Sequence, residues 1–375
     1  MTTFTHPRSL FHDPDAPTPQ VVAVDLFCGI GGLTHGLVEE GIEVVAGYDL
    51  DPTCRYAYEK NNRGAVFYDQ DVVQLQAEAL RSHYPEGAVR VLVGCAPCQP
   101  FSAVAAKNLK DKEVAEREPE WEPLRAFGRL IAELRPDVVS MENVTRLANR
   151  EKFPVYGEFL DGLRAAGYEV TEYRPFGPKY GIPQTRRRLV VFASRFGKVK
   201  LAPPTHSKEE YVGVGKVLAE LPKLEHGQTD PTDRIHMVSK LSDINYRRAK
   251  ESRPGGTWRD WPEDLWLECH KRPSGHSFPT VYGRMELNKP SPTLTTQFYK
   301  IGTGRFVHPT QHRGLSLREG AILQTFPPGY DFVDPKKPVS FSELGRHIGN
   351  AVPPRLGQVI AQSISSHLRQ AGIIW

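Results

Sequence analysis

The chain has 375 residues, of which 39% are hydrophobic and 25% charged, and its formal net charge is +4. This composition excludes a collagen-like, coiled-coil or disordered chain, and the length suits one large or two medium domains. No run of about 18 apolar residues could span a membrane, and the opening MTTFTHPRSL lacks the apolar core of a signal peptide. Five cysteines are too few for a disulfide framework, so we expect a reduced, intracellular protein.

Basic side chains gather in two windows of the sequence. Residues 173–208 hold nine Lys and Arg and no acid, whereas residues 271–314 hold seven against one glutamate. Because the whole chain carries only +4, the remaining residues are net acidic. Either window alone would be read as solvated surface charge. Together they favour a nucleic-acid-binding face on an acidic body.

Secondary structure is predicted in chain order from the apolar pattern. Residues 1–18, rich in proline, should form a loose tail. Nearly continuous apolar runs, typical of strands buried on both faces of a sheet, are 21–27, 43–49, 89–94, 137–142 and 188–194. Helical patterns ended by Gly or Pro are 32–40, 123–134 and 154–166. This alternation predicts a doubly wound α/β fold with a mainly parallel sheet.

The pattern changes after residue 200. Residues 201–307 are rich in Pro, Gly, Thr, His and aromatic residues without clean periodicity, which indicates a second, irregular domain. Regular structure resumes at 315–324 and in a closing helix from about 353 to 370, where two prolines suit a helix start. The predicted organisation is a tail (1–18), a first domain made of 19–200 plus 308–375, and a second domain (201–307).

The first motif that suggests chemistry is VDLFCGIGG, residues 24–32. An apolar strand there enters a glycine-rich turn and then a helix, so the backbone can approach a ligand at the carboxyl end of the strand. Asp49 ends the next strand, where a carboxylate typically binds ribose hydroxyls. These features indicate a nucleoside-containing cofactor. The glycines do not fit GxGxxG, and a tight turn without a ligand is the alternative.

The second motif is GCAPCQPFS, residues 94–102, directly after a strand. Cys98 is expected at the ligand-binding edge of the sheet, where a thiolate nucleophile would be useful. Cys95 and Cys98 also form CxxC, which can be a redox pair or half of a zinc site. No second CxxC or paired His supports zinc, so no metal is expected, and a redox pair would leave Glu142 without a role. Cys95 and Cys28 are interpreted as buried structural cysteines.

These motifs, with others in order, resemble the DNA cytosine-5 methyltransferases that use S-adenosylmethionine. The matching stretches are DLFCGIGG (25–32), PCQ (97–99), MENV (141–144), QTRRR (184–188), HPT with LSLRE and LQTFP (308–327), and GNAVP (349–353). The resemblance implies a Rossmann-like class I methyltransferase fold. It also implies that residues 201–307 form a smaller, irregular target-recognition domain.

The resemblance implies a covalent mechanism on a cytosine flipped out of duplex DNA. Cys98 would add to carbon 6 of the ring, which makes carbon 5 able to accept the methyl group. Glu142 would stabilise ring nitrogen 3 with a proton, and Arg188 would contact the carbonyl oxygen of the base. Further residues implied to support this site are Asn143, Gln184 and Arg186.

The resemblance also implies a site for S-adenosylmethionine, with S-adenosylhomocysteine as product. Phe27 and Leu50 would lie on the two faces of the adenine, and Asp71 would accept a hydrogen bond from its amine. The other implied cofactor contacts are Gly29, Gly31, Asp49, Val72, Pro97, Asn350 and Ala351.

The implied partner is double-stranded DNA, without any membrane. Residues 103–122 match a mobile loop that closes over the flipped base, and arginines of the second domain would read base edges. The candidate readers are Arg247, Arg248, Arg253, Arg259, Arg272 and Arg284. We expect a monomer in the bacterial cytoplasm, at the nucleoid, with a restriction endonuclease as genetic partner. The alternatives are an RNA cytosine-5 methyltransferase on the same scaffold and a catalytically silent DNA-binding relative.

Overall fold

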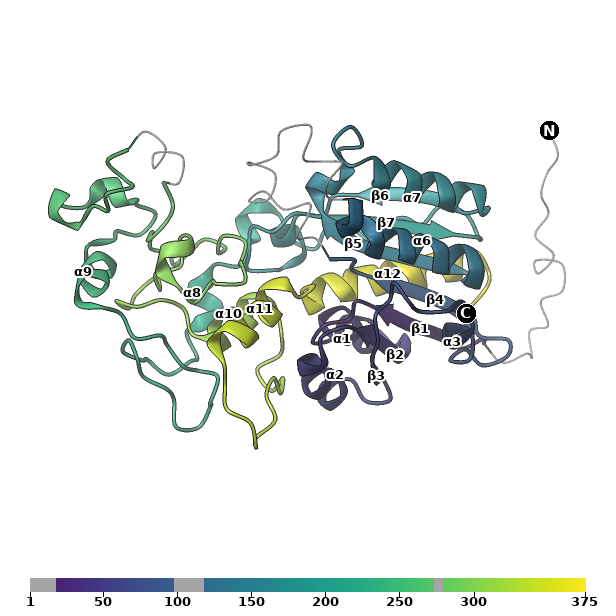
Figure 1. Cartoon of the computed structure of the whole chain (residues 1–375), viewed down its shortest axis with the longest axis horizontal. Coiled ribbons are helices and arrows are strands. Elements are labelled where there is room, and N and C mark those ends of the chain that lie inside the picture. The colour runs from purple at the N-terminus through teal and green to yellow at the C-terminus, as the bar shows by residue number, and fades with distance from the viewer. Residues whose placement is uncertain (1–17, 98–117, 273–278) are drawn as a thin grey trace.

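The computed structural model describes residues 18–97, 118–272 and 279–375. A seven-stranded sheet of order β3-β2-β1-β4-β5-β7-β6 forms one lobe (Figure 1). The strands are β1 (Val21–Leu26), β2 (Glu43–Asp49), β3 (Val66–Asp69), β4 (Val89–Gly94), β5 (Val138–Val144), β6 (Glu169–Tyr173) and β7 (Arg188–Ser194). Only β7 runs antiparallel to its neighbours, β5 and β6, so the predicted doubly wound, mainly parallel fold is confirmed.

Helices cover both faces of this sheet. On one face, α1 (Gly32–Glu39), α2 (Arg55–Asn61) and α12 (Pro354–Gln370) share a core with alternate residues of β1 and β4. On the other face lie α3 (Ala77–Arg81), α6 (Glu122–Leu134) and α7 (Pro154–Ala165), packed on the remaining alternate residues. None of the helices in the described part of the chain has the length and apolarity to cross a membrane.

The five predicted strands and the predicted helices are present, with ends that differ by at most two residues. The pattern missed β3 and β6. The first has only four residues, and the second, EVTEY at the sheet edge, alternates half-buried polar and apolar side chains. The antiparallel direction of β7 was not predicted either. It pairs Val144 with Arg188 and Glu142 with Val190, so the segment before β7 lies beside the end of β5.

The second lobe, on the left of Figure 1, contains short helices joined by irregular chain. They are α8 (Val214–Leu218) and α9 (Asp243–Glu251), with α10 (Leu317–Leu323) and α11 (Phe341–Asn350) between the lobes. Arg284 is 4% exposed and donates hydrogen bonds to the carbonyl oxygens of Ser252, Ala249, His308 and Gln311. Its guanidinium therefore ties this lobe together, and the prediction that Arg284 contacts DNA is wrong.

A second buried arginine holds the start of α10. Arg313 donates to both carboxylate oxygens of Glu319, at 2.8 and 2.7 Å, and both side chains are 1% exposed. Glu319 also caps α10, since its carboxylate accepts from the backbone of Ser316. Burial alone would raise the pKa of Glu319, but hydrogen bonds from Arg313 and His308 outweigh it and hold the pKa well below its ordinary value. Two of the seven basic side chains in residues 271–314 are thus internal.

This pair yields a stability prediction. Glu319→Gln keeps the size and the capping hydrogen bonds but leaves the Arg313 charge buried without a counter-charge, which typically costs about 3–5 kcal/mol. The free energy of unfolding, measured with urea, should fall by that amount. Glu268→Gln is the matched control, because its ion pair with Lys271 is exposed, and its urea midpoint should stay at the wild-type value. Equal midpoints for both variants would contradict the assignment.

Candidate functional site

A cavity of about 210 Å³ opens at the carboxyl edge of β1, β2 and β4. This is the edge at which parallel α/β sheets bind ligands, because the glycine-rich turns and helix starts meet there. Six predicted cofactor residues line it: Phe27, Gly29, Asp49, Pro97, Asn350 and Ala351. Asn350 is the last residue of α11 and Ala351 follows it, more than 300 residues after Phe27 in the sequence.

Four other predicted cofactor residues do not line this cavity. Leu50 is 68% exposed at the surface beyond β2, and Val72 is buried in the core beneath α6. Asp71 uses Oδ1 to accept from the backbone of Val73. Gly31 begins α1 in the left-handed conformation (φ +83°), where a Cβ would meet the Asn62 side chain at 2.5 Å. The roles of these four toward a cofactor stay predictions.

The turn between β1 and α1 is shaped by three residues with positive φ: Phe27 (+59°), Gly29 (+50°) and Gly31 (+83°). A left-handed backbone at a phenylalanine costs of order 1–3 kcal/mol and is found where function requires the geometry. Asp49 fixes the turn from the neighbouring strand, because its Oδ2 accepts from Gly29 N at 2.8 Å and its Oδ1 from Asp51 N at 2.9 Å. Burial raises the pKa of Asp49 above its ordinary value.

Asp25 is a wall residue of the cavity that motif reasoning left unassigned. It is 1% exposed, and its Oδ2 accepts from Thr34 Oγ1 at 2.7 Å. Its Oδ1 has no hydrogen-bond partner within the described residues. Burial raises the pKa of Asp25 to about 7. Burial of a polar oxygen without a hydrogen-bond partner costs free energy. This oxygen therefore favours a ligand that brings a hydrogen-bond donor or a positive charge.

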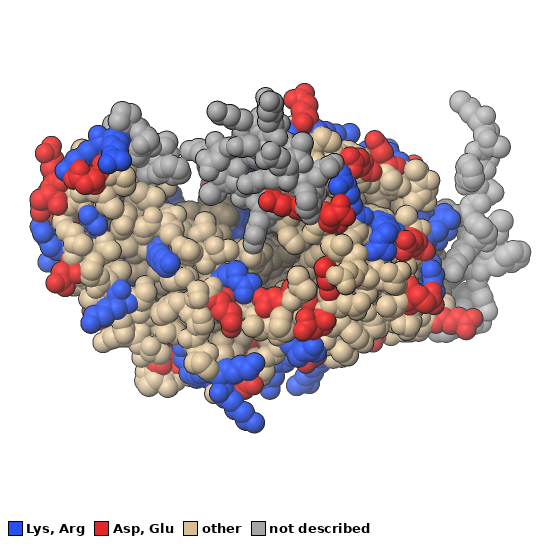
Figure 2. All heavy atoms as spheres, in the orientation of Figure 1, with Lys and Arg blue, Asp and Glu red and all other residues tan. Residues whose placement is uncertain are grey.

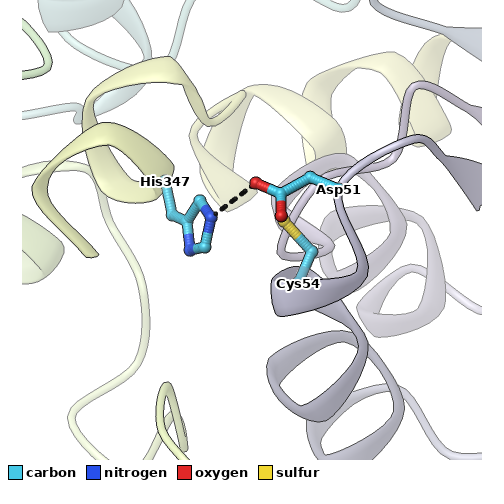
Figure 3. A group of neighbouring side chains, drawn as sticks. All are labelled: Asp51, Cys54 and His347. Carbon is cyan, nitrogen blue, oxygen red and sulfur yellow. Dashed lines mark hydrogen bonds and ion pairs between the residues drawn. The ribbon is translucent and has the colours of Figure 1, made fainter. Parts of the chain in front are cut away.

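Figure 3 shows a further part of the wall, where Asp51, Cys54 and His347 point toward one another. Their donor atoms lie within 4.8 Å of one another, close enough to be considered for a metal ion. However, Asp51 Oδ2 already lies 3.0 Å from His347 Nε2 and 2.7 Å from Arg346 Nη1. Burial also raises the pKa of the Cys54 thiol far above neutral pH. We therefore interpret the trio as a link between the segment after β2 and α11.

Next to the cavity, Glu142 lies near the end of β5 with 2% exposure. The Cys95 thiol, itself in the cavity wall, donates to Glu142 Oε2 at 3.0 Å. Arg188 Nε lies 3.0 Å from Oε1 but without hydrogen-bond alignment, and the buried Oε1 has no hydrogen-bond partner among the residues that the structure describes. The interpretation of Cys95 as a buried structural cysteine is therefore wrong, whereas Cys28 is buried as expected.

The other predicted catalytic residues contact protein groups around Glu142 and Arg188. Asn143 Nδ2 donates to Ala96 O at 3.1 Å, which joins the end of β5 to the segment after β4. Gln184 is fully buried and accepts from Leu294 N, while its Nε2 donates to Gln324 Oε1. Cys98 lies outside the described residues, as does most of the predicted loop at 103–122.

Arg186 contacts two predicted site residues at once. It is 4% exposed, and its guanidinium reaches Gln184 Oε1 at 3.4 Å and Ala351 O at 3.3 Å. The segment before β7 is thereby attached to the cavity wall that follows α11. Sequence reasoning found both segments but not their mutual contact.

On the face of the molecule seen in Figure 2, charge is less segregated than in the sequence. Figure 2 shows Lys and Arg interspersed with Asp and Glu over the visible face of both lobes. Several candidate DNA contacts are engaged locally: Arg247 pairs with Asp264 at 2.8 Å, Arg248 donates to Leu265 O, and Arg259 lies over the Trp258 ring. Arg253 and Arg272 are exposed.

The comparisons with known proteins agree along nearly the whole chain. Residues 21–366 match the profile described as C-5 cytosine-specific DNA methylase. The chain is 47% identical over 345 residues to the type II methylase M.HgiDII of Herpetosiphon aurantiacus, which covers 92% of this chain and 95% of the relative. It is 28% identical over 349 residues to the type II methyltransferase M1.HphI of Haemophilus parahaemolyticus, with 91% and 86% covered.

One solved structure supports the fold alone. It is described as a DNA modification methyltransferase encoded within a prophage of E. coli, and it superposes with a TM-score of 0.69 at 20% identity. The match covers 93% of this chain and 100% of that chain.

The Asp51 link yields a prediction about pH. Burial would raise the pKa of Asp51, but hydrogen bonds from Thr53, His347 and Arg346 outweigh it and lower the pKa well below its ordinary value. A carboxylate whose pKa is lower in the folded state adds stability above about pH 4 and loses it as the pH falls further. The deficit of Asp51→Asn in unfolding free energy should therefore be largest at pH 7 and should shrink below about pH 4.

Urea titrations of wild type and variant at pH 7 and pH 3 check this expectation. Asp161→Asn removes an exposed ion pair with Arg164 and serves as control, with little expected difference from wild type. An Asp51→Asn deficit of the same size at both pH values would show that the carboxylate charge is not what stabilises the link.

Proposed function

This chain belongs to the C-5 cytosine-specific DNA methylase family, and on that premise we propose how its residues carry out the reaction. It is a DNA cytosine-5 methyltransferase. The observation that carries the proposal is the position of Cys95, which lines the cavity and also contacts Glu142. A methyl donor bound in the cavity and a cytosine bound at Glu142 would thus lie on either side of the Cys95 side chain.

The residues of the cavity fit S-adenosylmethionine, which supplies an electrophilic methyl group when bound. Its sulfonium and ammonium charges suit a wall that contains the carboxyl groups of Asp25, which is buried, and Asp49, which is partly buried. The Asp25 oxygen without a partner would accept from the ammonium group, and Asp49 would hold ribose hydroxyls. Phe27 would pack on the adenine, and the bare backbone of Gly29 leaves room for the chain of the cofactor.

The chain's own residues activate the cytosine. The Cys98 thiolate forms a bond to carbon 6, and the displaced electron pair makes carbon 5 nucleophilic. Glu142 delivers a proton to ring nitrogen 3, for which its buried Oε1 has no competing hydrogen bond from the described residues. Arg188, beside that oxygen, contacts the carbonyl oxygen of the base. After methylation, carbon 5 loses its proton to a base, the thiolate leaves carbon 6, and nitrogen 3 returns its proton to Glu142, which restores the neutral aromatic ring.

Three of the predicted catalytic residues act as positioning residues in this proposal. Asn143 holds Ala96, two positions before the nucleophile Cys98. Gln184 and Arg186 hold the segment before β7 against α10 and Ala351, so that Arg188 meets Glu142. Their contacts with protein groups, together with their burial, support this role.

We propose duplex DNA as the substrate and residues 201–307 as the part that recognises the target sequence. Exposed arginines such as Arg253 and Arg272 are suited to base edges or phosphates. Because the curated relatives are type II enzymes, we propose a cognate restriction endonuclease as genetic partner. The enzyme would act as a monomer in the bacterial cytoplasm, at the nucleoid.

The covalent step gives one prediction. Duplex DNA that carries 5-fluorocytosine at the target should remain attached to the wild-type protein, because fluorine cannot leave carbon 5 as a proton does. Cys98→Ser should abolish the complex in denaturing gels. Cys95→Ser should retain it, since Cys95 contacts Glu142 and not the base. Equal loss in both variants would instead support a paired-cysteine role.

The proton step gives another prediction. Glu142→Gln keeps the shape and a hydrogen-bonding oxygen but cannot deliver a proton. Its single-turnover methylation rate should fall about 10²- to 10⁴-fold, while the dissociation constant for duplex DNA stays near the wild-type value. Quench-flow and gel-shift measurements separate the two quantities. An unchanged single-turnover rate would remove Glu142 from the mechanism.

A further inference from the structure

We infer that Cys95 is a positioning residue that selects which oxygen of Glu142 meets the base. The inference rests on the proposed role of Glu142. Its basis is the 3.0 Å hydrogen bond from the Cys95 thiol to Glu142 Oε2, in a part of the protein where Glu142 is 2% exposed.

The two oxygens of Glu142 have different neighbours. Oε2 accepts the hydrogen bond from Cys95, at the end of β4, whereas Oε1 lies beside Arg188 of β7 without an aligned hydrogen bond. Cys95 and Arg188 are the titratable or charged groups found in contact with this carboxyl within the described residues. The thiol therefore holds the carboxyl by one oxygen and leaves the other to exchange a proton with nitrogen 3 of the base.

The chemical nature of the donor matters. A thiol is a weak hydrogen-bond donor, but one such bond orients a buried carboxyl. A hydroxyl at the same place is also a donor and would hold the same oxygen. Alanine offers no donor, so the carboxyl would be free to present either oxygen to the base. We therefore expect Cys95→Ser to preserve the orientation of Glu142 and Cys95→Ala to lose it.

The place of Cys95 in the fold agrees with this role. Its side chain is part of the wall of the cofactor cavity, together with Asp25 and Asp49, and lies between that cavity and Glu142. The thiol can thus act on Glu142 without approaching the base itself. The motif GCAPCQ offered a redox pair as an alternative, but the observed hydrogen bond gives Cys95 a role that needs no oxidant.

The test is the single-turnover methylation rate on duplex DNA, for wild type, Cys95→Ser and Cys95→Ala. Cys95→Ala should lower the rate about 3- to 10-fold, which corresponds to the loss of one modest hydrogen bond. Cys95→Ser should keep the rate near the wild-type value, because its hydroxyl donates to the same oxygen. A merely structural role would not depend on a donor at position 95, so the serine variant would not be rescued relative to alanine.

Two controls make every result decisive. The Cys95→Ala change in a Glu142→Gln background should cause no further loss of rate, because the proton that Cys95 helps to direct is gone. Calorimetric binding of S-adenosylhomocysteine verifies that each variant is folded, and if Cys95→Ala does not bind it, Cys95→Val takes its place as the variant without a donor. Equal rates for the serine and alanine variants, or an equal loss from Cys95→Ala in the Glu142→Gln background, would overturn the inference. Absence of methylation by the wild type would contradict the proposed function instead.

Discussion

The close approach of α1 and α12 is the constraint on which the site depends. A Cβ on Gly32 would lie 2.2 Å from Val352 O, and one on Gly36 would lie 2.3 Å from Pro354 O. Glycine at both positions lets the first helix touch the backbone of a segment more than 300 residues later. Since Asn350 and Ala351 directly precede this contact, it brings them to the cavity wall opposite the β1 turn.

Strand direction supplies the second half of the site. Had β7 been parallel to β5, its first residue would lie at the far edge of the sheet. Because it is antiparallel, Arg188 begins the strand beside Val144, where β5 ends, and reaches Glu142. The donors of Arg186 and Gln184 then attach this strand start to the segment after α11 and to α10. The catalytic edge is thus held together by buried hydrogen bonds between segments that are distant in the sequence.

Much of the fold and part of the site could be predicted from the sequence, because burial and motif spacing leave clear patterns in it. Strands such as 89–94 are apolar throughout because they are buried on both faces, and that pattern is distinctive. The motifs assigned Glu142 and Arg188 to one site, and their side chains lie 3.0 Å apart. Six of the ten predicted cofactor residues line one cavity. The edge strand β6, half exposed and with polar residues interspersed, carries no such pattern.

What the sequence could not provide is the partner of each polar side chain. Arg284 and Arg313 counted as surface charge, yet both are buried and satisfied by groups that only the fold brings to them. Cys95 suggested a structural cysteine, because nothing local indicates a contact with a residue 47 positions later. The link between Asp51 and His347 likewise joins residues that are 296 positions apart.

The most direct test of the central claim is bisulfite sequencing after incubation of the purified protein with S-adenosylmethionine and plasmid DNA, with a tRNA transcript incubated in parallel. The account predicts that cytosines within one short DNA sequence become protected from conversion, while the tRNA stays unmodified. Protection of tRNA cytosines alone would contradict the account, as would full conversion of both nucleic acids.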